Sequence, residues 1–505
     1  MSNEPNQLTG PDLGAGVALN SLIESRPLLG HVAGEPVMLV RCEGKTYAVS
    51  ARCTHYGGPL DEGLITGCMV RCPWHHAAFD LRTGEAVRAP ALNRLPTYPV
   101  SVQGGQIVVG RKQEEGPLEP VAGTDPPVGP PASVVIVGAG AAGSSAAEML
   151  RRLGYRGSLI IVDPVESEPV DRPNLSKDYL AGTASEDWIP LRPPGFYPEH
   201  GIERIQGEVV QVNPESRLVM LAGGRALPYE RLLLATGSAP TRLDIPGADL
   251  PHVRELRTLD DSRKISALAA EATSVVVIGS SFIGMETAAA LRTRGLRIHV
   301  VSHDRIPFSK TLGPELGQVI QARFQAKGVT FHLSRTPTGI TSTHVHLDDG
   351  STIRADLIVV GIGVRPRVVL AGGAGLQMEN GIVVNEYLET SRPGIFAAGD
   401  IAAWPDPHTG RRIRVEHWVV AQRQGQTAAR NMLGQRQVFD AIPFFWTRFL
   451  GMDLGINYTG HALQGDRSIT RFGPGDQSVT SFQDGQHVHA VATIMNDTAS
   501  LLAEA

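Results

Sequence analysis

The stretch that decides the fold is Ser133-Val-Val-Ile-Val-Gly-Ala-Gly-Ala-Ala-Gly143. Its β-branched run predicts a buried parallel strand, and the residues that follow, Ser144–Arg152, predict a helix. Between strand and helix, Gly138 permits a tight turn, Gly140 lets the backbone approach a pyrophosphate and Gly143 lets the helix pack on the strand. The helix N-terminus then faces the phosphates. We therefore predict that this turn binds a dinucleotide.

A second pattern of the same kind occupies Thr273–Leu291. It carries Gly279 and Gly284, with Ser281 where the middle glycine is expected. Two such patterns in one chain imply two dinucleotides, and the simplest pair is a bound flavin and a nicotinamide that reduces it. We expect α/β doubly wound domains for both.

The length, net charge and hydropathy of the chain limit its domain number, its partners and its location. A chain of 505 residues predicts three or four domains, at roughly 100 to 200 residues per domain. The formal net charge of −5 indicates no nucleic-acid or anionic-membrane surface. There is no apolar run of about 18 residues that would cross a bilayer, and the first residues lack the basic and apolar regions of a secretory signal. We expect a cytoplasmic protein.

The cysteines lie in one region. All four, Cys42, Cys53, Cys68 and Cys72, precede residue 73, so the flavin portion cannot run a Cys-x-x-Cys disulfide relay. The surrounding residues, from about 15 to 110, read as short strands separated by glycine turns, which predicts an all-β module. We expect Cys42 and Cys68 to be buried strand residues.

Two short motifs in this module could bind metal: Cys53-Thr-His55 and Cys72-Pro-Trp-His75. A zinc finger supplies its ligands in the order Cys, Cys, His, His, whereas each loop here supplies one cysteine and one histidine. That order suits a 2Fe-2S centre in which one iron takes both thiolates and the other takes both imidazoles. Zinc, or four structural residues, are the alternatives.

The segments Cys53–Leu60, Cys72–Asp80 and Thr83–Glu85 resemble a Rieske ferredoxin domain. The resemblance implies that the ligands of the cluster are Cys53, His55, Cys72 and His75, and that His76 is a neighbour.

High-potential Rieske proteins carry further cysteines, a serine and a tyrosine where this chain has Gly58, Trp74, Ala77 and Phe79. Fewer hydrogen bonds to sulfur leave the reduced cluster less stabilised. We therefore expect a potential of roughly −150 mV, within reach of a nicotinamide donor.

An acidic residue after the second predicted strand could bind ribose. The strand is Ser158–Val162, and Asp163 stands about 20 residues beyond the glycines, followed by Pro164. Because the sequence does not fix where this strand ends, Glu166 is an alternative ribose-binding residue. The structural alternative is that Asp163 only forms a turn before Pro164.

The segment Asp171–Lys177 is similar to the Asp-Arg-Pro-x-Leu-Ser-Lys motif of flavoprotein ferredoxin reductases and apoptosis-inducing-factor-like proteins. A Rieske domain ahead of such a flavoprotein is the arrangement of the apoptosis-inducing-factor-like oxidoreductases. The similarity continues through Ala235–Gly237, Gly361–Pro366, Ile395–Asp400, Glu416–Trp418, Gln424–Gly425 and Pro443–Trp446.

The resemblance implies roles for single residues. Arg172 and Lys177 contact the flavin, and Asp400 accepts a hydrogen bond from its ribityl chain. Glu286 pairs with Lys177 near the incoming nicotinamide, and Trp418 lies against the stacked rings. We therefore expect Lys177, Glu286 and Trp418 to be catalytic. The structural alternatives are that Asp400 caps a helix, that Lys177 is solvated and that Trp418 belongs to the core. The other expected cofactor-binding residues are Thr236, Gly237 and Gly399.

The nicotinamide type depends on the strand Leu296–Val301, after which NAD-dependent enzymes place an acidic residue. That position falls on Ser302, followed by His303, Asp304 and Arg305. Serine and arginine tolerate a 2′-phosphate, whereas Asp304 argues against one. We expect NADH and keep NADPH open.

The composition and the motifs together predict a division into domains. Residues 437–505 read as a small α+β domain, and the Pro-rich segment 113–131 reads as a semi-rigid linker. The expected order is a Rieske domain at 1–112, the linker at 113–131, an FAD-binding domain at 132–245 and 366–436, an NAD(P)-binding domain at 246–365, and the C-terminal domain at 437–505.

We expect an NAD(P)H-dependent flavoprotein oxidoreductase that passes electrons through FAD to the fused Rieske 2Fe-2S centre and on to an external acceptor, an oxygenase or a cytochrome. The alternative is a redox-responsive, apoptosis-inducing-factor-like binding or signalling protein. An assimilatory nitrite reductase shares the Rieske and flavin parts, but its siroheme half needs cysteines that this chain does not have. A monomer or a homodimer is expected, with no nucleic acid and no membrane.

Overall fold

The computed structural model describes residues 9–113, 129–165 and 167–505. Most of the predicted linker, the first eight residues and Glu166 lie outside this description. The chain divides into two compact units, which are described separately. The first comprises residues 1–129, 148–156 and 497–505, and the second comprises residues 130–147 and 157–496.

The first unit is built from antiparallel strands, in accord with the all-β prediction. A four-stranded sheet has the order β2-β3-β4-β9, a second has the order β5-β6-β7-β8, and a three-stranded sheet has the order β1-β11-β10. Helix α9 (Asp497–Glu504) belongs to this unit. The strands are β1 (Val17–Ala18), β2 (Leu28–Val32), β3 (Glu35–Cys42), β4 (Lys45–Ser50), β5 (Leu64–Thr66), β6 (Met69–Arg71), β7 (Ala78–Asp80), β8 (Ala86–Arg88), β9 (Thr97–Tyr98), β10 (Val100–Gln103) and β11 (Gln106–Val109).

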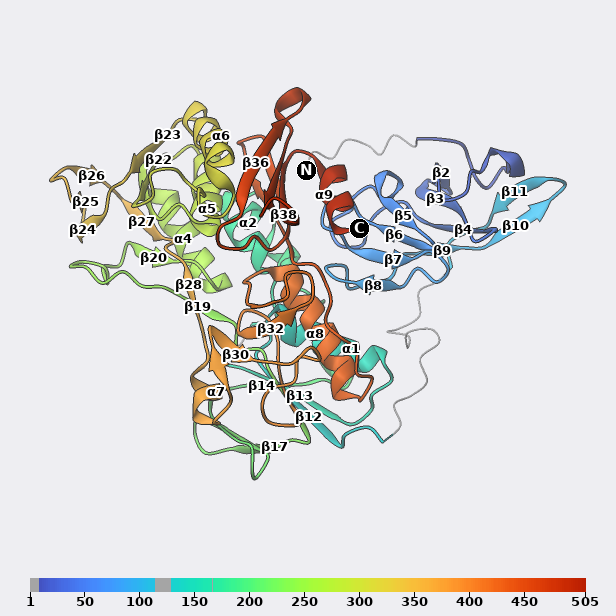
Figure 1. Ribbon diagram of the computed structural model, residues 1–505, viewed down its shortest axis with the longest axis horizontal. Coiled ribbons are helices and arrows are strands. Elements are labelled where there is room, and N and C mark those ends of the chain that lie inside the picture. The colour runs from blue at the N-terminus through green and yellow to red at the C-terminus, as the bar shows by residue number, and fades with distance from the viewer. Residues whose placement is uncertain (1–8, 114–128, 166) are drawn as a thin grey trace. The chain divides into compact units, whose positions relative to one another are not determined.

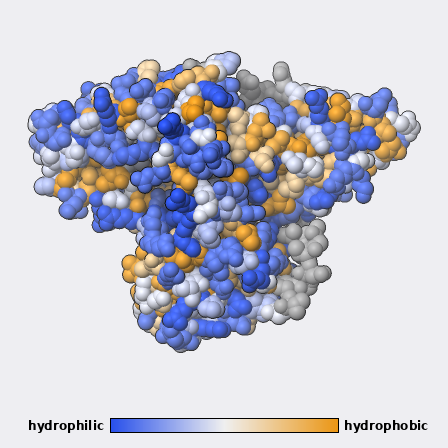
Figure 2. Space-filling view, viewed as in Figure 1, coloured by the Kyte–Doolittle hydropathy of each residue, from blue (hydrophilic) through white to orange (hydrophobic). Residues whose placement is uncertain are grey.

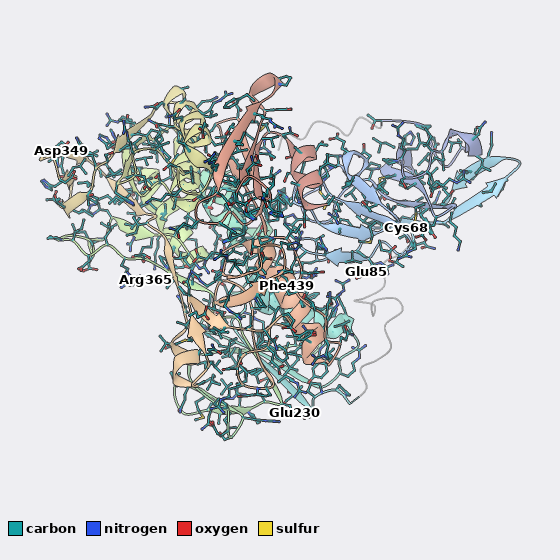
Figure 3. The ribbon with its side chains drawn as sticks, in the orientation of Figure 1. Cys68, Glu85, Glu230, Asp349, Arg365 and Phe439 are labelled. Atoms are coloured by element: carbon teal, nitrogen blue, oxygen red, sulfur yellow. A yellow bond between two sulfur atoms is a disulfide. The ribbon has the colours of Figure 1, made fainter. Side chains whose placement is uncertain are left out.

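One cysteine prediction in this unit is incomplete. Cys42 and Cys68 are buried, as expected, but they form a disulfide with a Cα–Cα distance of 5.5 Å. Cys68, labelled in Figure 3, lies in the turn before β6 and not in the strand, because Gly67 adopts a φ of +58° there. The disulfide therefore joins the end of β3, in one sheet, to the start of β6, in another.

The first glycine-rich turn lies in a parallel sheet of the second unit, ordered β14-β13-β12-β18-β31. Helix α1 (Ala141–Arg152) follows β12, and helix α8 (Trp418–Met432) packs against its start (Figure 1). The approach is close, because a Cβ at Gly425 would lie 2.1 Å from the carbonyl oxygen of Ala142. The strands are β12 (Ser133–Val137), β13 (Ser158–Asp163), β14 (Glu203–Gln206), β18 (Arg231–Leu234) and β31 (Ile395–Ala397).

The second glycine-rich turn lies in another parallel sheet, ordered β20-β27-β21-β22-β23. Helix α5 (Phe282–Thr293) follows β21, and helices α4 (Leu259–Glu271) and α6 (Gly313–Ala326) belong to the same half. Its strands are β20 (Val253–Glu255), β21 (Ser274–Ile278), β22 (Arg297–Ser302), β23 (Val329–Leu333) and β27 (Leu357–Val360). The two parallel sheets confirm the α/β prediction.

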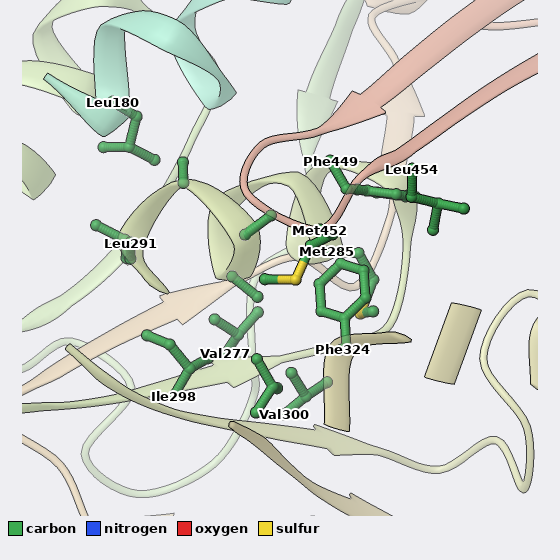
Figure 4. Packing of buried hydrophobic residues seen from close by; sticks show 14 of the residues in the cluster. Leu180, Val277, Met285, Leu291, Ile298, Val300, Phe324, Phe449, Met452 and Leu454 are labelled. Carbon is green, nitrogen blue, oxygen red and sulfur yellow. The ribbon is translucent and has the colours of Figure 1, made fainter. Parts of the chain in front are cut away.

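The C-terminal part is an antiparallel sheet ordered β34-β35-β38-β37-β36. Phe449, Met452 and Leu454 pack into the same buried cluster as Val277 and Met285 of the second parallel half (Figure 4). The sheet is therefore joined to that half by a shared apolar core. Its strands are β34 (Phe444–Phe449), β35 (Leu454–Gly460), β36 (Arg467–Phe472), β37 (Ser478–Gln483) and β38 (Val488–Ile494).

Shorter elements complete the second unit. They are β15 (Val209–Asn213), β16 (Leu218–Leu221), β17 (Ala226–Pro228), β19 (Ser238–Pro240), β24 (Pro337–Ile340), β25 (His344–Leu347), β26 (Thr352–Arg354), β28 (Val364–Pro366), β29 (Met378–Glu379), β30 (Gly381–Val383), β32 (Ala402–Asp406), β33 (Arg411–Ile413), α2 (Asp178–Ala181), α3 (Phe196–Glu199) and α7 (Val369–Gly373).

Hydrophilic and hydrophobic residues are interspersed over the face seen in Figure 2. Within the described ranges, no helix has the length and apolar character needed to cross a membrane.

Candidate active site and metal centre

The first glycine-rich turn has the conformation that a dinucleotide site requires. Gly138 has a φ of +107°, and a Cβ there would lie 2.4 Å from the carbonyl oxygen of Ala235. A Cβ at Gly140 would lie 3.4 Å from the guanidinium of Arg172. At Gly140 no side chain therefore stands between the backbone of the turn and the guanidinium of Arg172. A pyrophosphate needs this kind of access to both.

Asp163 ends strand β13 beside this turn. Its carboxylate accepts hydrogen bonds from the backbone N–H of Ala139 at 2.7 Å and of Val165 at 2.9 Å. The side chain is thus held at the carboxyl end of the sheet, where ribose hydroxyls are bound in this type of fold.

A cavity of about 660 Å³ opens beside the turn, a size typical of cofactor sites. It is bordered by Gly140 of the first glycine-rich turn and by Ser281 of the second. The expected residues Arg172, Lys177, Gly237, Glu286, Gly399, Asp400 and Trp418 all line it, together with the aromatic residues Phe282, Phe445, Trp446 and Tyr458.

An ion pair lies on the wall of this cavity. Lys177 Nζ is 2.8 Å from Glu286 Oε1, and both side chains are largely buried. The hydroxyl of Ser176 donates to Glu286 Oε2 at 2.5 Å, and that of Thr447 donates to Glu286 Oε1 at 2.6 Å. The carboxylate is therefore held by Ser176 at the end of 3-10 helix η3 (Arg172–Ser176), by Lys177 directly after that helix, and by Thr447 of β34.

A second charged group gathers around Asp400. Its carboxylate is 3.1 Å from Arg257 Nη2, while the half-buried Arg172 lies close by. Burial, followed by repulsion from Arg257, lowers the pKa of Arg172 to about 10. Three guanidinium groups, those of Arg172, Arg257 and Arg367, interact here with the two carboxylates of Asp163 and Asp400, which leaves positive charge for an anionic ligand such as a pyrophosphate.

His417 and Trp418 stand at the start of helix α8. Burial lowers the pKa of His417 to about 3, so its imidazole is neutral at physiological pH. Its buried Nδ1 has no hydrogen-bond partner in the described part of the chain. A buried ring nitrogen of this kind fits a polar group of a bound cofactor.

Two expected flavin-binding residues have other partners. The hydroxyl of Thr236 donates to the carbonyl of Arg367 at 2.7 Å, and Thr236 does not line the cavity. The backbone N–H of Gly399 donates to Gln424 Oε1 at 2.7 Å. Three residues that the sequence did not single out, Arg257, Thr447 and His417, do line the cavity. Since no local pattern in the sequence marks Arg257 or Thr447, only the fold could reveal these two residues.

The second glycine-rich turn repeats the first in part. Gly279 has a φ of +106°, and a Cβ at Gly284 would lie 2.5 Å from the carbonyl oxygen of Gly279. Ser281 replaces the middle glycine and caps helix α5, because its hydroxyl accepts from Gly284 N at 3.3 Å and donates to the carbonyl of Gly361 at 2.7 Å. The turn keeps its geometry without the middle glycine.

In the first unit, the two metal-ligand motifs converge. His55 Nδ1 lies 3.1 Å from His75 Nδ1, and the buried thiols of Cys53 and Cys72 are hydrogen-bonded to each other. Burial lowers the pKa of His55 to about 3, so the imidazole is neutral, the form that coordinates metal. The hydrogen bond to Cys72, together with burial, raises the pKa of Cys53.

The packing around Cys72 and His76 is close. A Cβ at Gly58 would lie 2.7 Å from Cys72 Sγ, so a larger residue there would press on the thiol of an expected ligand. His76 is fully buried, and its two ring nitrogens contact Glu504 Oε2 at 2.5 Å and Ser500 Oγ at 3.2 Å, both in helix α9. Both nitrogens of His76 are therefore engaged away from the expected ligands.

Two protein families match the chain. Residues 132–425 match the pyridine nucleotide-disulphide oxidoreductase family, and residues 18–99 match the Rieske [2Fe-2S] domain. The first match covers more than half of the chain and both glycine-rich turns. The chain belongs to the pyridine nucleotide-disulphide oxidoreductase family and carries an N-terminal Rieske domain.

Individual relatives agree. Human apoptosis-inducing factor 3 is 33% identical over 488 residues, which are 91% of this chain and 78% of that protein. Rubredoxin-NAD(+) reductase of Pseudomonas putida is 35% identical over 64% of this chain and 85% of its own length. The solved putidaredoxin reductase–putidaredoxin complex matches with a TM-score of 0.71 and 31% identity over 74% of this chain and 92% of that chain.

The fold, the cavity and these relatives define an FAD-dependent NAD(P)H oxidoreductase of the ferredoxin-reductase type. Its cofactors are FAD and a Rieske 2Fe-2S cluster, and its electron donor is a reduced nicotinamide nucleotide. The electron path therefore leads from the nicotinamide through FAD to the Rieske centre.

Proposed function

We propose that this protein is a self-contained reductase that delivers single electrons from its Rieske centre to an external oxygenase or cytochrome. When bound, FAD accepts a hydride from NAD(P)H and gives up its two electrons one at a time to a one-electron carrier. The observation that carries the proposal is the single cavity bordered by both glycine-rich turns. One cavity of this kind lets two dinucleotides meet at their reactive rings.

The residues of the cavity would bind and orient both nucleotides. We propose that Arg172 neutralises the pyrophosphate of FAD, and that Gly138, Gly140 and Gly143 let it approach the backbone. Lys177, fixed by Glu286, would direct its ammonium group at the flavin, while Trp418 would cover the stacked rings and exclude water. The remaining cofactor contacts would come from Asp163, Thr236, Gly237, Gly279, Gly284, Gly399 and Asp400.

We propose Cys53, His55, Cys72 and His75 as the ligands of the Rieske cluster. Their convergence in one centre, with both thiols buried, both imidazoles half-buried and a neutral imidazole at His55, supports the assignment. One iron would take both thiolates and the other both imidazoles, and the histidine edges would serve as the exit for electrons.

The division into domains at 112, 131, 245, 365 and 436 is part of the proposal, with the C-terminal residues 497–505 grouped with the first unit. It is supported by the antiparallel sheets before residue 113, the two parallel sheets and the sheet that begins at β34. We also propose a cytoplasmic location, where reduced nicotinamides are supplied, and a monomer or homodimer. Cell fractionation and sedimentation would test these two points.

An anaerobic titration with NADH and with NADPH, followed by optical and electron paramagnetic resonance spectra, tests the electron path. We expect the flavin to bleach and the cluster to become reduced. In His55→Cys and His75→Cys, the Rieske signal should shift or vanish while the flavin still bleaches. His31→Cys, on β2 of the same unit, is the matched control and should keep the signal.

Two outcomes would contradict the proposal. A cluster that stays oxidised while the flavin bleaches fully would leave only the hydride step. Slow turnover with an artificial acceptor, together with a long-lived reduced flavin–nicotinamide complex, would favour the redox-responsive binding protein, which the similarity to apoptosis-inducing factor 3 makes the second candidate.

A further inference from the structure

The two parallel halves of the second unit can be aligned residue by residue through their hydrogen bonds. In the first half, Gly138 N donates to the carbonyl of Val162 at 2.8 Å, and in the second half Gly279 N donates to that of Val301 at 2.8 Å. Val162 and Val301 are therefore equivalent, and so are the residues that follow them, Asp163 and Ser302. Ser302 occupies the position that Asp163 has in the first half.

This position decides how a ribose is bound. Asp163 presents a carboxylate, which can accept hydrogen bonds from ribose hydroxyls. Ser302 presents a hydroxyl that lies 2.9 Å from that of Ser280, and the residue is 3% exposed. The second half therefore has no carboxylate at this point, and a hydroxyl can donate to a phosphate oxygen.

Asp304 does not restore the missing carboxylate. Its backbone N–H donates to Ser302 Oγ at 3.2 Å. Its side chain is 3.0 Å from Lys310 Nζ, which balances its charge, and 3.4 Å from His303 Nε2. The aspartate that favoured NADH in the sequence is engaged with Lys310 and His303 of its own loop.

Basic side chains surround the end of β22. His303, Arg305 and Lys310 are exposed there, and Lys310 pairs with the carboxylate of Asp304. Arg335 lies nearby as well, since its backbone N–H donates to the carbonyl of Ser302 at 3.0 Å, but its guanidinium is bonded to Asp349, labelled in Figure 3, at 2.6 Å. The local charge is positive, as a 2′-phosphate requires.

We propose that the nucleotide site is built for a 2′-phosphate, so that NADPH is used at least as efficiently as NADH. Ser302 would donate to the phosphate, and Arg305 would supply its counter-charge. The inference rests on the proposed function, because it concerns the donor of the same hydride.

The test compares kcat/KM for NADPH and NADH in the holoenzyme, with ferricyanide as the acceptor. The ratio of the NADPH value to the NADH value should be one or more. Ser302→Glu should lower this ratio about tenfold or more, because a carboxylate repels a 2′-phosphate and accepts from a ribose hydroxyl. Arg297→Gln makes the same change in charge, −1, at the other end of β22 and should leave the ratio unchanged.

Two further measurements make the test independent of turnover and of folding. Calorimetry should show that adenosine 2′,5′-bisphosphate binds more tightly than adenosine 5′-monophosphate. Arg305→Ala alters an exposed residue and should also lower the NADPH to NADH ratio. A ratio below one, or tighter binding of the monophosphate, would overturn the inference. Failure of both nucleotides to bleach the flavin would instead overturn the proposed function.

Discussion

Glu286 Oε1 lies 2.8 Å from Lys177 Nζ, and the same carboxylate accepts hydrogen bonds from the hydroxyls of Ser176 and Thr447 at 2.5 and 2.6 Å. Ser176 is 110 residues from Glu286 in sequence and Thr447 is 161 residues away. The network therefore forms only when the first parallel half, the second parallel half and the C-terminal sheet are all folded. It fixes the position of a buried ammonium group at the cavity wall.

Glu286→Gln should separate the structural role of this network from its catalytic role. The amide keeps the size of the side chain but leaves Lys177 without a carboxylate, which should lower the free energy of unfolding by about 3 kcal/mol. Flavin reduction by NAD(P)H should slow by about 100-fold, because the ammonium is no longer held in place. Denaturant unfolding and stopped-flow absorbance measure the two effects.

The double variant Lys177→Met/Glu286→Gln is the control. It removes both charges and should recover most of the lost stability, while flavin reduction stays slow. Normal reduction in Glu286→Gln would show that the ion pair serves only the fold.

The pKa of Arg172 predicts how the affinity for FAD depends on pH. Burial and Arg257 lower its pKa to about 10, and a bound pyrophosphate favours the protonated guanidinium. The affinity of the apoprotein for FAD should therefore be constant well below pH 10 and fall as the pH rises through that value. Flavin fluorescence on reconstitution measures it. In Arg172→Gln the affinity should be lower throughout and lose this step, and a wild-type affinity that does not change across the same range would contradict the assignment.

The sequence predicted those features that depend on local patterns. The two glycine-rich turns follow from a β-branched run and spaced glycines, because a short stretch of chain determines both. The convergence of His55 and His75 was anticipated through two compact motifs. Arg257 was not, because its partner Asp400 is 143 residues away, and nothing beside Arg257 marks the contact. Pairs of this kind depend on how remote elements pack, which periodicity does not encode.

The Rieske centre should have a potential near the lower end of its range, roughly −150 mV. Ala77 is fully buried beside the ligand loop, since its carbonyl accepts from Cys72 N at 2.8 Å, and it has no hydroxyl to offer a cluster sulfur. Ala77→Ser should raise the potential by an amount on the order of tens of millivolts, because a hydrogen bond to sulfur stabilises the reduced cluster. Protein-film voltammetry measures it.

Ala78→Ser is the matched control for this prediction. Ala78 is the next residue and is also buried, but as the first residue of β7 its side chain points to the opposite face of the strand from that of Phe79. Its substitution should leave the potential unchanged. Equal shifts in both variants would show that added polarity, and not a specific hydrogen bond, sets the potential.

The disulfide between Cys42 and Cys68 could not be predicted from the spacing of the cysteines, because pairing requires two Cα atoms at the right separation, which only the packed sheets provide. It closes a loop of 26 residues, so removing it should lower the free energy of unfolding by about 3.5 kcal/mol in the loop-entropy account. Cys42→Ala/Cys68→Ala should unfold at lower denaturant concentration than the wild type.

Thiol titration of the denatured apoprotein without reductant should find two thiols, those of Cys53 and Cys72. Four thiols would show that the pair is reduced, the usual state in a cytoplasm, and the double variant should then lose only the packing of two small buried side chains.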